Sequence, residues 1–218
     1  SRLLAMTLAV AALLTGCAAS RSPIDGVFGD APGRTRVTAP VSVLFHFRHL
    51  AQQHGFDTIP KLQASGGRDF DNLFSDALRE LGNVGSYETF TDLPGDVNEP
   101  ERRSELADAR AAADYVLAID VFEESRFRQQ CLSAIVSTLS LTLIPMPYDW
   151  EYTLSATVTA KDGRVVATYE RRATLTNWIQ FFLMFAYPFH PIEGKQEEII
   201  SESLRDILRQ VEAEGVLM

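Results

Sequence analysis

The sequence predicts an α/β (α+β) fold in which helices cover one mixed five-stranded sheet, in the element order β-α-β-α-β-β-β-α. Three observations predict it. Apolar runs typical of buried strands alternate with helical patterns in the first half, two strands flank an Asp-Gly turn, and the C-terminal part carries an amphipathic stripe. The length of 218 residues fits one folded domain, predicted over 41–218.

The first half of this domain predicts two strands with a helix between them. Residues 41–47 form an apolar run suited to a buried strand, and residues 86–91 suit a second, short strand. Between them, residues 69–81 carry apolar side chains at helical spacing. These side chains are Phe70, Leu73, Phe74, Ala77, Leu78 and Leu81.

A second helix is predicted over 98–113. Asn98 is its expected N-cap, and Pro100 and Glu101 suit its first turn, where proline is tolerated and a negative charge meets the positive end of the helix dipole. Residues 114–122 follow as a strand with apolar residues on both faces, which indicates a central place in the sheet.

A hairpin is predicted between residues 150 and 175, where apolar and polar residues alternate on both sides of Asp162-Gly163. Asp-Gly is typical of a two-residue type I′ turn, so the numbers of paired residues should sum to 325 and Ala160 should face Val165. Arg171 then interrupts an apolar face. We expect it to reach past the sheet edge or to mark a bulge.

An amphipathic helix predicted over 193–214 completes the domain. We expect its apolar stripe to pack on the sheet. The stripe consists of Ile199, Ile200, Leu204, Ile207, Leu208 and Val211.

The N-terminal residues predict a lipidated envelope protein. The apolar run from Leu3 to Leu14 is too short to cross a membrane, since twelve helical residues span about 18 Å against about 30 Å of hydrocarbon. The following Leu-Thr-Gly-Cys sequence resembles the bacterial lipobox, which implies a signal peptide over 1–16 and a lipid anchor, with palmitate, on Cys17. Ala18 after that cysteine favours the outer membrane by the same resemblance.

Composition limits the remaining possibilities. Residues 17–40 are rich in Ser, Pro, Gly and Arg and are predicted to be a flexible tether. The formal net charge of −9 disfavours a nucleic-acid partner, because the chain repels phosphates. With Cys17 acylated, Cys131 is the other cysteine of the two, so no intramolecular disulfide is expected.

No catalytic motif stands out in the sequence. It contains no glycine-rich phosphate loop, Gly-x-Ser-x-Gly elbow, His-Glu-x-x-His or Cys-x-x-Cys pattern, so neither an enzyme nor a cofactor is predicted. His46, His49 and His54 cluster in the sequence, but a strand puts His46 and His49 on opposite faces. This pattern favours solvated or hydrogen-bonded histidines over a metal site, and no metal ligand is predicted.

Two uncharged apolar segments, 131–146 and 178–189, differ from the rest of the domain. Both are too short to cross a bilayer, and the hairpin register predicts that both emerge at the sheet end opposite the turn. Three interpretations of these segments remain open. They add to the buried core, they form an apolar protrusion that contacts a membrane or a protein partner, or they line a pocket for a lipid. The residues predicted to contact a membrane or partner are Leu132, Ile135, Leu139, Leu141, Leu143, Ile144, Trp178, Ile179, Phe181, Phe182, Leu183 and Phe185.

Three short stretches, Ala113 to Leu117, Tyr152 to Leu154 and Lys161 to Val166, resemble envelope lipoproteins of the curli-secretion and penicillin-binding-protein-activator type. The resemblance covers residues 41–213 in element order. It implies a sheet-and-helix domain that works through partners and has no catalytic residues.

We therefore expect a non-enzymatic lipoprotein that faces the periplasm from the outer membrane, as an accessory or scaffold of a cell-envelope assembly. Its expected partners are the membrane, through Cys17, and an envelope protein or lipid. The alternative is a lipoprotein that binds or transports a lipid or another hydrophobic ligand.

Overall fold

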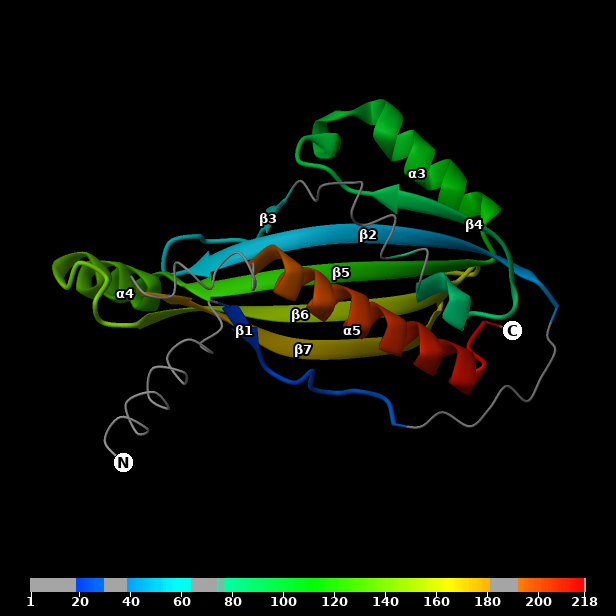
Figure 1. Cartoon of the computed structure of the whole chain (residues 1–218). Helices are drawn as coiled ribbons and strands as arrows, with labels where there is room; N and C mark the ends of the chain where they lie inside the picture. Colours follow the sequence, from blue (N-terminus) through cyan, green and yellow to red (C-terminus); the bar gives the residue numbers. More distant parts are fainter. Residues whose placement is uncertain (1–18, 30–38, 64–73, 75–76, 181–191, 218) are drawn as a thin grey trace.

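The computed structural model describes residues 19–29, 39–63, 74, 77–180 and 192–217. Within them, seven strands form one mixed sheet in the order β1-β7-β6-β5-β2-β3, with β4 also paired to β2 (Figure 1). The strands are β1 (Ala19–Arg21), β2 (Val41–His54), β3 (Lys61–Leu62), β4 (Val84–Thr91), β5 (Tyr115–Arg126), β6 (Met146–Ala160) and β7 (Val165–Ile179). The helices are the 3-10 turns η1 (Leu78–Glu80) and η2 (Asp96–Asn98), and the α-helices α3 (Pro100–Ala112), α4 (Phe127–Leu139) and α5 (Ile192–Glu214).

The predicted fold class is confirmed. β2 is parallel to β4 and β5, and the other pairs are antiparallel, so the sheet is mixed. β5 lies between β2 and β6, which confirms the central strand. The short strands β1 and β3 add to the five predicted ones, and helix α4 between β5 and β6 is absent from the predicted order. Most of the helix predicted over 69–81 lies outside the described residues, although Phe74 and Ala77 are helical and η1 follows them.

The sheet buries side chains on both faces, under different helices. The stripe of α5 packs on one face against alternate residues of β5, β6 and β7, as its pattern predicts. On the opposite face, Ala109 and Ala113 at the end of α3 pack on Leu44 and Phe90. The buried residues of the α5 stripe are Ile199, Ile200, Leu204, Ile207, Leu208 and Val211.

The hairpin register is confirmed over most of its length, but its turn is not type I′. Pairs such as Tyr152 with Ala173 have numbers that sum to 325, whereas next to the turn Thr159 pairs with Val165. Of the turn residues only Gly163 has a positive φ, and its N–H donates to the carbonyl of Ala160 at 2.8 Å. The predicted pair of Ala160 with Val165 is wrong, because a left-handed glycine adds one residue and forms a bulge.

The start of α3 also differs from the prediction. Asn98 is not the N-cap, because the chain first makes the 3-10 turn η2, in which the Asn98 N–H donates to the Gly95 carbonyl at 2.9 Å. Glu99 takes the cap position, without a side-chain cap bond, and Pro100 is the first helical residue.

Arg171 neither reaches past the sheet edge nor marks a bulge. Its side chain is 4% exposed beneath α5, where Nε donates to Asp206 Oδ2 at 2.7 Å and Nη2 donates to Gln210 at 2.6 Å. The charge on the apolar face is therefore neutralised by a carboxylate of the covering helix, which the strand pattern alone did not predict.

The same carboxylate holds the N-terminal segment. Residues 19–29, expected within a flexible tether, instead follow the sheet edge and α5. β1 pairs with β7, Asp25 forms a bridge with Arg172, and the Phe28 N–H donates to Asp206 at 2.9 Å. Residues 17, 18 and 30–38 lie outside the described residues.

We expect Asp206→Ala to lower the free energy of unfolding by about 3–5 kcal/mol, because it leaves the Arg171 guanidinium buried without its carboxylate. Urea unfolding followed by circular dichroism measures the change. The control is Arg172→Ala, which removes the exposed pair with Glu170 and should cost at most about 1 kcal/mol. Equal losses in the two variants would contradict the role of the buried pair.

Candidate functional site

Helix α4 continues the path of β5 beyond the end of that strand and runs beside β6 (Figure 1). Gln129 Nε2 donates to Asp149 at 2.7 Å, and Ser133 Oγ donates to the carbonyl of Pro147 at 2.9 Å. The distance between the two donors along α4 agrees with the distance between the two acceptors along β6, since four helical residues rise about 6 Å and two strand residues about 6.6 Å. α4 is therefore tied by hydrogen bonds to the part of β6 that β5 no longer covers.

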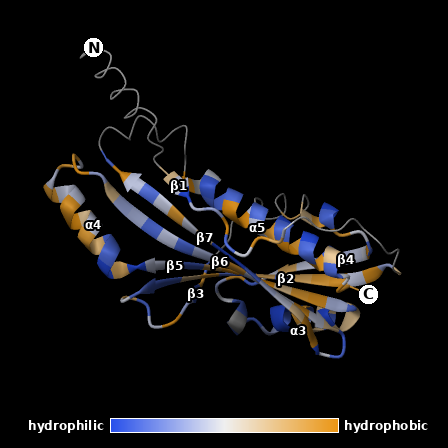
Figure 2. Cartoon of the chain, turned by 90° about the horizontal axis from the view of Figure 1, so that it is seen from below, coloured by the Kyte–Doolittle hydropathy of each residue, from blue (hydrophilic) through white to orange (hydrophobic). Residues whose placement is uncertain are grey.

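The outer face of α4 is apolar and its inner face is polar. Ser133 and Ser137 are the buried residues of the helix. The leucines and isoleucines point away from the sheet, and Figure 2 shows hydrophobic residues along α4 beyond the body of the domain. The exposed apolar side chains are Leu132, Ile135, Leu139, Leu141, Leu143 and Ile144. Together with the exposed Trp178 and Ile179 they form what we call the apolar end.

These exposures test the first alternative, additional core, for the first apolar segment. Leu139 and Leu141 are 81% and 78% exposed, so they are not extra core of the domain. An exposed apolar surface of this kind usually marks a site of contact with a membrane or a partner.

The turn that follows α4 holds two residues in the left-handed region. The Leu141 N–H donates to Thr138 at 3.1 Å and the Thr142 N–H donates to Ser137 at 2.7 Å, which is the Schellman pattern of a helix end. Leu141 has φ 50° and Thr142 has φ 60°. Glycine usually occupies the first of these positions, because a side chain there costs about 1–2 kcal/mol. The chain therefore exposes a leucine at a position whose backbone favours glycine.

The second apolar segment begins at the same end of the sheet, as predicted. Pro147 pairs with Trp178, and Gln180 Nε2 donates to the Leu143 carbonyl at 3.4 Å. The other predicted contact residues of this segment, and the predicted lipidation site, are outside the described residues. They are Phe181, Phe182, Leu183, Phe185 and Cys17.

The three clustered histidines all lie on β2, and each one faces a carboxylate. Nε2 of His46 lies 2.9 Å from Asp92, that of His49 lies 3.6 Å from Glu123, and that of His54 lies 2.5 Å from Glu124. No group of three or more His, Cys, Asp and Glu residues in the described part of the chain could hold a metal ion.

Two other groups near these histidines have shifted pKa values. The hydrogen bond that Arg48 donates to Asp120 raises the pKa of the guanidinium. Burial, together with the charge of Glu123, raises the pKa of the Tyr152 hydroxyl. Both shifts keep the side chain in its usual charge state at neutral pH.

A cavity of about 310 Å³, which we call the neck cavity, lies where the sheet meets α4. It is lined by His54, Glu124, Ser125, Arg126, Gln129, Asp149, Glu151 and Thr174. The sequence did not predict this site, because its lining residues come from separate elements and no local motif joins them. The pairing of Glu124 with Glu151 joins β5 to β6, and neither the hairpin prediction nor the central-strand prediction gave that register.

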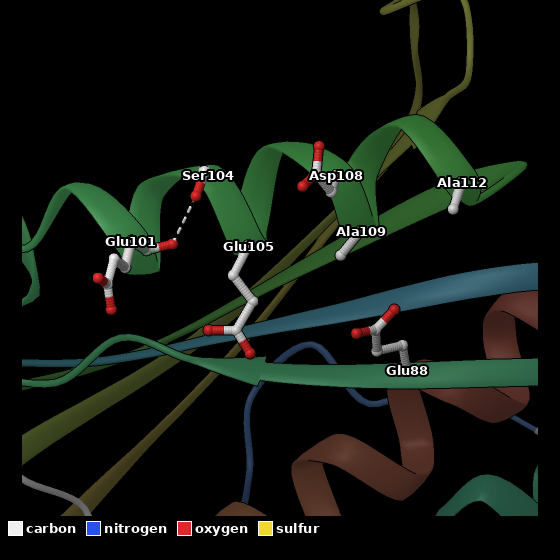
Figure 3. A pocket seen from close by; sticks show the side chains of 7 residues that line it. All are labelled: Glu88, Glu101, Ser104, Glu105, Asp108, Ala109 and Ala112. Carbon is white, nitrogen blue, oxygen red and sulfur yellow. Dashed lines mark hydrogen bonds between the residues drawn. The ribbon is translucent and has the colours of Figure 1, made fainter.

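A second cavity of about 530 Å³ lies between α3 and β4, at the other end of the sheet (Figure 3). Its polar lining consists of Glu88, Glu101, Glu105, Asp108 and Ser104. The Ser104 hydroxyl donates to the Glu101 carbonyl at 2.8 Å. The hydroxyl therefore donates to a backbone carbonyl and not to one of the lining carboxylates, so these residues do not form a nucleophile–base pair.

None of the helices within the described residues combines the length and the apolar character needed to cross a membrane.

No protein-family model matches the chain, and no curated protein matches it in sequence. Among solved structures, the chain is similar to a dodecamer of a PelC variant from Paraburkholderia phytofirmans, with 12% identity and a TM-score of 0.33, over 88% of this chain and 97% of that chain. A second PelC dodecamer from the same organism has 12% identity and a TM-score of 0.31, over 86% and 95% of the two chains. At these values the likeness assigns the chain neither a family nor a function.

Proposed function

We propose that this protein is a non-enzymatic lipoprotein of the cell envelope, held against a bilayer by an acyl anchor on Cys17 and by its apolar end. In this position it serves as an accessory or scaffold of an envelope assembly, facing the periplasm from the outer membrane. The observation that carries the proposal is the reversed polarity of α4, which buries serines and exposes leucines.

The path of β1 supports a shared membrane contact for anchor and apolar end. Ala19, its first residue, pairs with Asn177, next to Trp178. β1 runs from there toward the hairpin turn, because it is antiparallel to β7. Two residues span at most about 7 Å of chain, so Cys17 is attached close to the apolar end. An acyl chain and these leucines can therefore enter one patch of bilayer.

Energetics favour the use of both contacts. A single acyl chain gives marginal, reversible membrane binding, and stable attachment needs a second signal. Each leucine or isoleucine that leaves water for hydrocarbon contributes about 1.5–3 kcal/mol. The exposed side chains of α4 and its following turn are sufficient for that second signal.

We expect Leu139→Gln with Leu141→Gln to weaken binding of the unlipidated mature chain to phospholipid vesicles at least tenfold, because two inserted leucines are lost. Vesicle co-sedimentation measures the binding. The matched control is Val165→Gln with Val166→Gln, at the opposite end of the sheet, where the side chains are 57% and 41% exposed. Equal binding by both double variants would overturn the membrane contact, and phospholipid copurifying with the detergent-free chain would favour the ligand-carrier alternative.

We expect Leu141→Gly to weaken vesicle binding about threefold or more without lowering stability. Removing the left-handed leucine relieves about 1 kcal/mol of backbone strain, which offsets the greater freedom of glycine in the unfolded chain. Urea unfolding and vesicle co-sedimentation measure the two effects. A large loss of stability would mean instead that Leu141 packs within the fold.

We expect Cys17→Ser to abolish incorporation of a labelled fatty acid in cells and to shift the protein from the membrane fraction toward the soluble fraction. Gel fluorescence of the labelled envelope measures incorporation. Cys131→Ser is the matched control, since it removes the other cysteine and should keep the label. Continued acylation and processing of the Cys17→Ser protein would contradict the anchor.

A further inference from the structure

We propose that the neck cavity binds the phosphoethanolamine headgroup of a membrane phospholipid. The inference rests on the proposed function, because a headgroup reaches this cavity only when the apolar end enters the bilayer. Its volume of about 310 Å³ is at the lower end of the range typical of small-ligand sites, about 300–1,000 Å³. The ligand is therefore a small polar group and not an acyl chain.

The charges that line the cavity match a zwitterion. The lining contains three carboxylates, those of Glu124, Asp149 and Glu151, against one guanidinium, that of Arg126, and one imidazole, that of His54. The surplus negative charge favours an ammonium group, and the guanidinium provides a partner for the adjacent phosphate. Phosphoethanolamine carries these two groups, of opposite charge, on one short ethylene bridge.

Glu124 and Glu151 retain the capacity to accept further hydrogen bonds. Within the described residues, Glu124 is bound by His54 at 2.5 Å, and the partner of Glu151 is Arg126 at 3.6 Å. Each carboxylate has about four lone-pair positions. Asp149, by contrast, already accepts from both Gln129 and Thr176 at 2.7 Å. The ammonium contact is therefore assigned to Glu124 and Glu151.

The position of the neck cavity along α4 matches the headgroup layer of a bilayer into which the helix inserts. Gln129, in the first turn of α4, lines the cavity, and Leu139 at the last turn lies about 15 Å further along the helix. This distance is about half of the 30 Å hydrocarbon thickness of a bilayer. Tyr148 and Trp178 lie between the two levels on the strands, where interfacial aromatic residues are found. With α4 in the acyl layer, the neck cavity thus meets the phosphates.

This chemistry discriminates between phospholipid classes. Phosphatidylethanolamine donates N–H groups to the carboxylates, whereas the trimethylammonium of phosphatidylcholine has no N–H to donate. Phosphatidylglycerol has no cationic group, so the surplus carboxylates repel it.

The test is native mass spectrometry of the purified lipidated protein in non-ionic detergent. Each phospholipid is added separately, with the same acyl chains and at the same concentration. We expect at least fivefold more bound phosphatidylethanolamine than phosphatidylcholine or phosphatidylglycerol. Glu124→Gln with Glu151→Gln should abolish that preference, and Arg126→Gln should weaken phosphatidylethanolamine binding severalfold. The control, Glu101→Gln with Glu105→Gln in the second cavity between α3 and β4, should keep the preference.

Equal binding of the three lipids by the unaltered protein would overturn the headgroup site, and so would a preference that survives the Glu124 and Glu151 changes. Soluble phosphoethanolamine added in equal amount should not displace the lipid; full displacement would assign the cavity to a soluble ligand and overturn the lipid assignment. Loss of the lipid preference leaves the proposed function intact when the Leu139 and Leu141 changes still reduce vesicle binding.

Discussion

The antiparallel pairing of β6 with β7 determines the arrangement on which the apolar end depends. Side chains alternate between the two faces of a strand. The pairing register therefore determines which side chains are buried and where one strand ends relative to its neighbour. In this register Met146 pairs with Ile179, so the segment that enters β6 and the segment that leaves β7 meet at one end of the sheet. β1 adds to the same part of β7, which brings the start of the described chain to that end.

The reversed polarity of α4 follows from the length of β5. That strand ends at Arg126, so among the described residues the backbone of β6 before Trp150 has no strand partner on that side. Backbone carbonyls that are covered but not hydrogen-bonded are costly, and α4 supplies side-chain donors in place of a strand. The Ser133 hydroxyl donates to the Pro147 carbonyl, and the Gln129 amide donates to the side-chain carboxylate of Asp149. Because these polar residues occupy the inner face, the leucines and isoleucines of the helix are left on the outer face.

Strand pattern was enough to predict the mixed sheet, its central strand and the hairpin register, because burial imposes a period of two that is visible in one sequence. The strand pattern did not predict contacts in which the partner side chain comes from a distant part of the sequence. Nothing near Arg171 identifies Asp206, 35 residues away, as its counter-ion. The same carboxylate accepts a hydrogen bond from the Phe28 N–H. The composition of this segment predicts a flexible tether, but its contacts with distant residues, which composition does not reveal, hold it against the domain.

The apolar end was predictable in part for the same reason. Its location followed from the register, whereas its exposure depended on which face of α4 the serines occupy. Because α4 has few charged residues, its sequence has no clear polar and apolar periodicity that would predict which face is exposed. The neck cavity also required positions on five elements to be combined, namely β2, β5, α4, β6 and β7.

The ordered path of residues 19–29 changes how an anchor and the apolar end act together. A flexible tether over 17–40 would separate the acyl chain from the domain by roughly 25–30 Å on average. β1 instead begins two residues after Cys17, which limits that separation to about 7 Å. If Cys17 carries the proposed acyl chain, insertion of one group would hold the other at the bilayer surface. The second insertion would then be effectively intramolecular and would gain from a high local concentration. Under the proposed function, two weak attachments at this spacing would bind as one strong attachment and would limit the orientation of the sheet more than a long tether does.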